Sequence, residues 1–226
     1  MQNPSIYFGT FEFREPVTTL TDIIVGVTCL FFVVWLNRRK KSASSTFTFY
    51  KNYLLIFSFG IICGGILGHG LQAYISPSWK MVGWILSLIG QVYLVLASLK
   101  QLDGIINSKI QKLLLRFTIT SLVIASVLIL LPITRHFIIT QITSTILVLG
   151  ITLPLQAFHY VKTKSKGSLL MCYGILVLLI PAVVFNFNFN LGKWFNAMDI
   201  AHVFMNISVV LMFFGIKQLA LTTNKK

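Results

Sequence analysis

Long runs of apolar residues, separated by short polar connections, dominate the chain. Each run is about 20 residues long, which is the length that an α-helix needs to cross a hydrocarbon core. Uninterrupted apolar windows predict seven spans, at residues 18–36, 50–73, 81–99, 113–131, 137–160, 168–187 and 195–216. The connections, such as NRRKKSASS and KTKSKG, are too short for an extramembrane domain. We therefore expect residues 1–226 to form a single transmembrane domain.

The windows and the composition together predict the fold class. Inside a bilayer every backbone amide needs a partner within the protein, so only α-helices and closed β-barrels span it. The apolar windows are about twice the length of a barrel strand. Only 11% of the residues are charged and 56% are hydrophobic, whereas an ordinary soluble domain is about 25% charged. The expected class is all-α, a polytopic membrane protein with seven transmembrane helices.

Basic residues are distributed unequally between the two sides of this layout. The chain has 19 Lys and Arg against 5 Asp and Glu, and all but Arg14, Lys80, Arg135 and Lys193 fall on one side. By the positive-inside rule that side is cytoplasmic, so we expect the N-terminus outside and the C-terminus inside. The basic surplus is thereby explained by topology and by attraction to anionic lipid, and nucleic acid is not an expected partner. The expected location is the inner (plasma) membrane of a bacterium.

Polar side chains gather at one depth on three of the expected helices. An ionisable group within a span costs roughly 2.5 to 3.5 kcal/mol on insertion scales, so each one needs a partner or a function. Spacings of three and four residues place the members on one face of each helix, near its outer end. They are Glu15, Thr19 and Asp22 on the first span, His69 and Gln72 on the second, and Asn196, Asp199, His202 and Asn206 on the seventh.

This cluster predicts a metal site. His nitrogen and carboxylate oxygen are preferred zinc ligands, and we expect His69, Asp199 and His202 to bind Zn²⁺ or another divalent ion. Asp22 or Asp199 is then the candidate catalytic base. The alternative is an interhelical lock in which His69 pairs with Asp22 or Asp199, without metal or chemistry.

Small and helix-breaking residues predict where helices approach and bend. Gly60, Gly64 and Gly68 recur every four residues in FGIICGGILGHG and predict a close helix contact. Pro154 and Pro181 each remove a backbone donor inside an apolar run, so both helices are expected to kink there. Such kinks open space for a cavity.

Other polar residues are assigned to packing or to the membrane surface. His159, at the inner end of its span beside Tyr160, is expected among lipid headgroups, and His136 is a reserve ligand near the level of the cluster. Gln91 and Gln141 are candidate donors from a cavity wall or ordinary interhelical hydrogen-bonding residues.

The arrangement resembles the seven-helix membrane hydrolases typified by alkaline ceramidases and the adiponectin-receptor-like proteins. His69 and His202 match that group in helix and depth, and EPVTTLTD, from Glu15 to Asp22, is similar to the acidic opening of the ceramidase first helix. The sequence departs from it at DIAH, which replaces an HxxxH pair, and at Gly65, where that group has Ser. The third span also lacks the opening Asp. The resemblance implies a metal-dependent hydrolase.

Two functions from different classes remain after these arguments. The first is metal-dependent hydrolysis of a lipid amide or ester, in which the ion polarises the carbonyl and a carboxylate accepts a proton. The second is a non-enzymatic receptor, carrier or assembly component, in which the polar cluster contacts a ligand or locks helices together. An opsin is excluded, because the seventh span has no mid-membrane Lys for a Schiff base and Lys217 lies at its cytoplasmic end.

Overall fold

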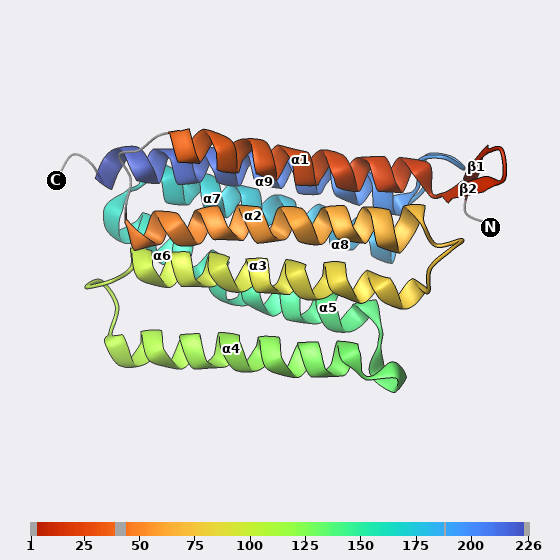
Figure 1. Cartoon of the computed structure of the whole chain (residues 1–226). Helices are drawn as coiled ribbons and strands as arrows, with labels where there is room; N and C mark the ends of the chain where they lie inside the picture. The colour runs from red at the N-terminus through yellow and green to blue at the C-terminus, as the bar shows by residue number, and fades with distance from the viewer. Residues whose placement is uncertain (1–3, 39–43, 188, 224–226) are drawn as a thin grey trace.

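The protein is a bundle of roughly parallel and antiparallel helices with a small β-hairpin at one end (Figure 1). The computed structural model describes residues 4–38, 44–187 and 189–223. The α-helices are α1 (Pro16–Arg38), α2 (Ser45–Gly65), α3 (Lys80–Gln101), α4 (Ser108–Leu130), α5 (Phe137–Thr145), α6 (Leu153–Thr163), α7 (Lys166–Val177), α8 (Leu179–Asn186) and α9 (Ala197–Thr223). Two π-helical segments, η1 (Ile66–Gly70) and η4 (Ile146–Thr152), continue α2 and join α5 to α6, and two short 3₁₀ turns, η2 (Pro77–Trp79) and η3 (Pro132–Thr134), precede α3 and follow α4.

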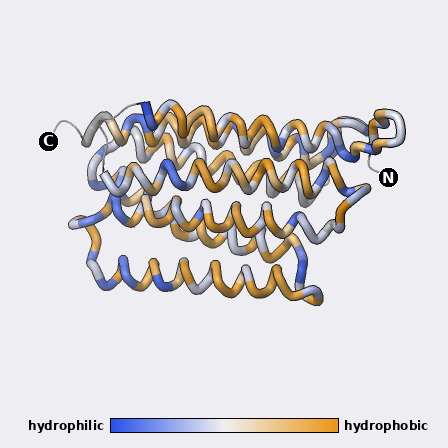
Figure 2. The backbone as a smooth tube through the Cα atoms, viewed as in Figure 1, coloured by the Kyte–Doolittle hydropathy of each residue, from blue (hydrophilic) through white to orange (hydrophobic). Residues whose placement is uncertain are grey.

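The helices have the length and composition of membrane spans. Within the described ranges, six continuous helical segments are long and apolar enough to cross a bilayer: Pro16–Arg38, Ser45–Gly70, Lys80–Gln101, Ser108–Leu130, Phe137–Thr163 and Ala197–Ala220. The remaining expected span, 168–187, overlaps the shorter apolar helix Lys166–Pro181. Apolar residues run along the helices and hydrophilic ones gather near their ends (Figure 2). The prediction of an all-α integral membrane protein is confirmed at this level.

The hairpin is an element that the apolar windows did not predict. β1 (Ser5–Phe8) pairs antiparallel with β2 (Phe11–Arg14), and the turn between them places Gly9 at a φ of +64°, which favours glycine. Tyr74, which lies beyond the end of α2, anchors the hairpin. The Tyr74 ring stacks on Phe11 at a centroid separation of 5.1 Å, and its hydroxyl accepts a hydrogen bond from the Glu12 amide at 2.5 Å. The end of the bundle that carries the hairpin is called the hairpin end below.

The predicted glycine contact is found between α2 and α3. A Cβ atom added to Gly60 would lie 2.8 Å from the Ser87 nitrogen, and one added to Gly83 would lie 2.7 Å from the Gly60 oxygen. Such separations are too short for real side chains, so glycine at both positions lets the backbones approach. This contact fixes α3 against α2 beside the polar cluster.

Both proline-containing spans are irregular, as expected. Pro154 opens α6 directly after the π-helical segment η4, where the regular hydrogen-bond ladder changes. Ahead of Pro181 the helix is divided at Leu178 into α7 and α8. Proline has no backbone N–H, so the regular pattern of helical hydrogen bonds is interrupted in the turn that precedes it.

Candidate functional site

Two histidine–carboxylate pairs lie at the hairpin end of the bundle. The Nδ1 atom of His69 contacts Glu15 Oε2, and the Nε2 atom of His202 lies 3.1 Å from Asp22 Oδ1. All four side chains are largely buried; the two histidines are 12% exposed. The cluster residues on the first, second and seventh expected spans are therefore brought together, in a pairing different from the lock of His69 with Asp22 or Asp199.

Glu15 reaches His69 because of the backbone that connects β2 to α1. Glu15 has a φ of +44°, a left-handed conformation that a non-glycine residue rarely adopts. The Glu15 amide donates to the Pro4 oxygen at 2.8 Å, and the Glu15 oxygen accepts from the Thr19 amide at 2.9 Å, so both sides of the junction are fixed. A strained residue at a buried polar site is a common mark of function.

Both ring nitrogens of His202 have polar neighbours. The Thr21 hydroxyl lies 2.9 Å from Nδ1 and 2.9 Å from the Thr18 oxygen, so it can donate to either one. Asp22 Oδ1 lies 3.1 Å from Nε2. A histidine and a carboxylate at this distance can share a proton, which is the property of a group that transfers protons.

Close packing of α1 against the end of α2 explains a departure from the ceramidase-like pattern. A Cβ atom added to Gly65 would lie 2.7 Å from the Asp22 Cβ, so a serine at this position would displace Asp22. The Thr19 hydroxyl also donates to the Gly65 oxygen at 3.2 Å. Gly65 thus positions the carboxylate that pairs with His202.

Asp199 has a structural contact at the start of α9. Its Oδ2 accepts the Asn196 amide at 2.7 Å, and Asn196 Oδ1 accepts the Met198 amide at 2.8 Å, a reciprocal cap of the helix N-terminus. Asp199 is fully buried, its Oδ1 has no hydrogen-bond partner among the described residues, and its charge is near enough to Asp22 to interact with it. Asp199 therefore lies near the pairs, and among the described residues its hydrogen bond goes to the helix N-terminus and not to a histidine.

The remaining predicted residues have separate environments. The Gln72 amide donates to the Gly68 oxygen within its own turn. Asn206 Oδ1 is buried one turn beyond His202 and has no partner in the described part of the chain. Neither contributes to the two pairs.

The side chains do not fit the expected zinc site. In residues 4–38, 44–187 and 189–223, no three His, Cys, Asp or Glu side chains are placed to hold one metal ion together. Both ring nitrogens of His202 have partners, and His69 faces Glu15. A divalent ion at His69, Asp199 and His202 would require His202 to lose its contact with Asp22 or with Thr21, and metal binding there stays a prediction.

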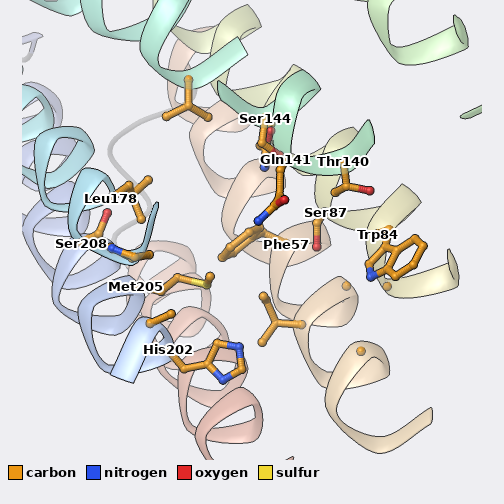
Figure 3. Close-up of a pocket in the computed structure, with 18 of the residues that line it drawn as sticks. Phe57, Trp84, Ser87, Thr140, Gln141, Ser144, Leu178, His202, Met205 and Ser208 are labelled. Atoms are coloured by element: carbon orange, nitrogen blue, oxygen red, sulfur yellow. Dashed lines mark hydrogen bonds between the residues drawn. The ribbon is translucent and has the colours of Figure 1, made fainter. Parts of the chain in front are cut away.

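A cavity of about 410 Å³ extends from the two pairs into the bundle. Asp22, His69, Lys80 and His202 lie at its polar end, and the rest of its lining is mostly apolar. In the close-up, His202, Met205 and Ser208 of α9 lie on one side, and Ser87, Thr140, Gln141 and Ser144 of α3 and α5 lie on the other (Figure 3). Its volume is typical of a small-molecule site.

Sequence reasoning missed part of this lining. Thr21 was not singled out although its hydroxyl lies 2.9 Å from His202 Nδ1, and Lys80 was assigned to topology alone. Ser87, Thr140 and Ser144 were indistinguishable from packing residues. A usable signal was the spacing of four between Ser87 and Gln91, and again between Thr140 and Ser144, which places polar groups on one face of each helix.

A second polar region, the amide network, lies at the opposite end of the bundle. Gln156 donates to the Tyr50 hydroxyl at 2.8 Å, and Gln101 donates to His159 Nδ1 and to the Ser168 hydroxyl, both at 2.8 Å. Tyr50 in turn donates to Gln101 Oε1 at 2.7 Å. Gln101 and Ser168 thus join His159 Nδ1 to an interhelical network, and the expected contact of His159 with headgroups stays a prediction.

The comparisons with known proteins give a family without an assigned function. They found no match among curated proteins and none among solved structures. A family model described as "Family of unknown function (DUF6962)" matches residues 17–221, nearly the whole helical bundle. The chain therefore belongs to the DUF6962 family.

Proposed function

We propose that this membrane protein binds an amphiphilic, lipid-like molecule in the cavity between its helices. The observation that carries the proposal is the cavity itself, which joins the histidine–carboxylate pairs to an apolar interior. A lipid-like molecule has the same division, with a polar head and an apolar tail. This is the receptor or carrier class of function, with the polar cluster as a ligand contact.

The polar end suits a head group that forms hydrogen bonds. His69, His202 and Asp22 line the cavity with nitrogen and oxygen atoms, and Lys80 adds an ammonium group. Such groups within a membrane are costly unless they are satisfied. A bound head group would provide additional partners for them.

The interior suits an acyl chain. Phe57, Leu94, Val148 and Met212 line the part of the cavity furthest from the pairs along their helices. Pro181 also borders it, so the break between α7 and α8 forms part of the wall. A lateral entrance for a membrane-dissolved molecule fits this irregular helix, whose backbone is less constrained than that of its neighbours.

The same proposal includes seven crossings with the hairpin end outside. Lys and Arg residues cluster at the opposite end, where α1 and α3 finish and α4 begins, as Arg38, Lys100 and Lys109 illustrate. By the positive-inside rule this end is cytoplasmic. The ligand head would then lie in the outer half of the membrane.

A matched pair of glycine substitutions tests ligand binding. Gly64 lines the cavity, and a Cβ atom added there meets no atom within 4 Å, so Gly64→Leu should fill the cavity without a clash. Gly150 is equally unobstructed but borders a separate apolar groove without the histidine–carboxylate pairs, so Gly150→Leu is the control. Native mass spectrometry of detergent-purified protein should detect a bound amphiphile in wild type and Gly150→Leu, and at least tenfold less in Gly64→Leu. Equal occupancy in both variants would contradict the proposal.

A second candidate function, hydrolysis of an ester or amide bond, is favoured by the orientation of His69. Glu15 contacts Nδ1, whereas Nε2 has no hydrogen-bond partner among the described residues, and the ring lines the cavity. A carboxylate that holds Nδ1–H leaves Nε2 able to accept a proton. Nε2 would take a proton from water as its oxygen bonds to the substrate carbonyl, and would return it to the departing alcohol or amine.

His69→Gln separates this candidate from simple binding. Loss of a general base should lower the rate of fatty-acid release by about 10²- to 10⁴-fold, while the amphiphile still binds. The measurement is release of fatty acid from a lipid ester in detergent, with and without a chelator. No release by the wild type would limit the function to binding.

A further inference from the structure

A second hollow, the α4–α6 groove, lies between the first half of α4 and the segment formed by η4 and α6. Ile110 and Leu114 line it on α4, Pro154 and Phe158 line it on α6, and Gly150 lies at its deep end. Every residue of its lining is apolar, and none of them also lines the central cavity. Its volume is about 420 Å³. The groove is therefore a separate, wholly apolar space.

The helix α4 packs less closely than the other long spans, and this leaves the groove open. Only 17% of its apolar window is buried, against 39% to 56% in the other five, and it lies at the edge of the bundle (Figure 1). Gly150, opposite α4, has no side chain, and a Cβ atom added to it would meet no atom within 4 Å. The described residues therefore leave this space to molecules of the membrane.

The position and length of the groove suit one acyl chain. It begins near the end of the bundle opposite the hairpin, since Ile110 is in the first turn of α4 and Phe158 is near the end of α6. From Phe158 to Gly150 it extends roughly 12 Å, at about 1.5 Å of rise per residue. One leaflet contributes about half of a hydrocarbon core roughly 30 Å thick. A chain that enters beside Phe158 would thus lie within one leaflet.

Positive charge lies where the groove begins. The Nζ atom of Lys162 is 5.6 Å from the centre of the Phe158 ring, and this lysine is exposed. Lys109, also exposed, is in the first turn of α4. Four of the five Asp and Glu residues lie toward the hairpin end, and the fifth, Asp103, pairs with Lys100. The groove thus joins an apolar space to ammonium groups.

We infer that the α4–α6 groove binds an anionic phospholipid, with one acyl chain between the helices and the phosphate beside Lys162. Basic pockets between transmembrane helices bind anionic head groups, and each lysine near the membrane surface adds attraction. A zwitterionic phospholipid has the same chains, but its own cation offsets its phosphate, so it is bound less tightly. The site is separate from the central cavity and does not rest on the proposed function.

Two phospholipids with the same chains test the site. Dioleoyl phosphatidylglycerol is anionic, and dioleoyl phosphatidylcholine is zwitterionic. The full-length protein is exchanged into fresh detergent to remove bound lipid, each phospholipid is titrated back, and its complex is identified by mass in native mass spectrometry. Phosphatidylglycerol should bind at least about fivefold more tightly, the effect of one lysine near a membrane surface. Equal affinities would overturn the inference.

A pair of lysine substitutions separates a site from general attraction. Lys162→Gln should lower the affinity for phosphatidylglycerol about fivefold and leave that for phosphatidylcholine unchanged. Lys193→Gln removes the same charge from an exposed position near the hairpin end, and it should change neither affinity by more than about twofold. An equal loss in both variants would show attraction by net charge alone and would overturn the site.

A pair of glycine substitutions tests where the acyl chain lies. Gly150→Leu should fill the groove and lower the affinity for phosphatidylglycerol about tenfold. Gly64→Leu, which fills the central cavity instead, should leave it unchanged. Unchanged affinity in Gly150→Leu would overturn the placement of the chain in the groove. Because the added phospholipid is identified by its mass, the groove and the amphiphile cavity can fail independently.

Discussion

The two polar regions at the ends of the bundle use similar residue types in different ways. At the hairpin end, His69 and His202 face carboxylates and line a cavity. At the opposite end, His159 faces Gln101 and Ser168, and none of the three borders that cavity. The first region is ionisable and accessible to a ligand. The second is composed of neutral groups that bond to one another.

Under the proposed function, the amide network stabilises the bundle and the histidine–carboxylate pairs bind the ligand. Neutral amides and hydroxyls that satisfy each other hold helices together at modest cost. Here Gln156 bonds to Tyr50, Ser98 and Gln101, and so joins α2, α3 and α6. Ionisable pairs are more expensive in a membrane and are found mainly where they act. We expect substitutions in the amide network to change stability, and substitutions at the histidine–carboxylate pairs to change ligand binding.

The largest effect on stability should come from Gln156→Leu. Gln156 is 1% exposed, and its amide nitrogen lies within hydrogen-bonding distance of the Tyr50, Ser98 and Gln101 oxygens, so its loss removes the bonds that join α6 to α2 and α3. The free energy of unfolding should fall by about 1 to 3 kcal/mol, measured by denaturation in mixed micelles, with amphiphile affinity within twofold of wild type. Gln111→Leu on α4, which removes an amide that has no side-chain hydrogen bond in the described residues, is the control. If Gln111→Leu lowers the free energy of unfolding as much as Gln156→Leu does, the amide network has no special role in stability.

Asp22→Asn should produce the reverse pattern. An amide cannot share a proton with His202 as a carboxylate does, and the change is at the polar end of the cavity. Amphiphile affinity should fall about tenfold, which corresponds to roughly 1.4 kcal/mol, with a smaller change in unfolding. The matched control is Asp103→Asn, because Asp103 pairs with Lys100 at the exposed opposite end. Unchanged affinity in Asp22→Asn would mean that the histidine–carboxylate pairs, like the amide network, have a structural role.

Tyr74→Phe should give the smallest effect and sharpen the role of the hairpin. It removes the hydroxyl that accepts from the Glu12 amide and keeps the ring that stacks on Phe11. An exposed hydrogen bond of this kind is worth less than about 1 kcal/mol. Hydrogen exchange at Glu12 should accelerate up to about fivefold, and amphiphile affinity should change less than twofold. A larger loss of affinity would mean that the hairpin holds Glu15 in place.

The helices were predictable from sequence because the bilayer imposes a length and a composition on them. Apolar windows located the spans, and the spacing of Gly60 and Gly64 located a close contact. The hairpin was not predicted, since its strands of four residues are too short to produce a clear alternation. A turn signal at Gly9 was present in the sequence but has little weight by itself.

Which residues belong to the site was easier to predict than which carboxylate pairs with which histidine. Spacing placed Asp22 and His202 on polar helix faces, but which carboxylate meets which imidazole depends on how the helices rotate and pack. The amide network was missed because its groups come from separate helices. The spacing of three between Gln156 and His159, and between Ser98 and Gln101, was the available signal.

The order in which the two pairs can form follows from their separation along the chain. His69 follows Glu15 by 54 residues, whereas His202 follows Thr21, the neighbour of Asp22, by 181. At about 5 to 20 residues per second, the ribosome needs roughly 10 to 40 s to reach the later histidine. During that interval the Asp22 carboxylate of α1 lacks the imidazole that it faces in the folded bundle. The contact between the first and last helices can therefore form only after α9 has been synthesised.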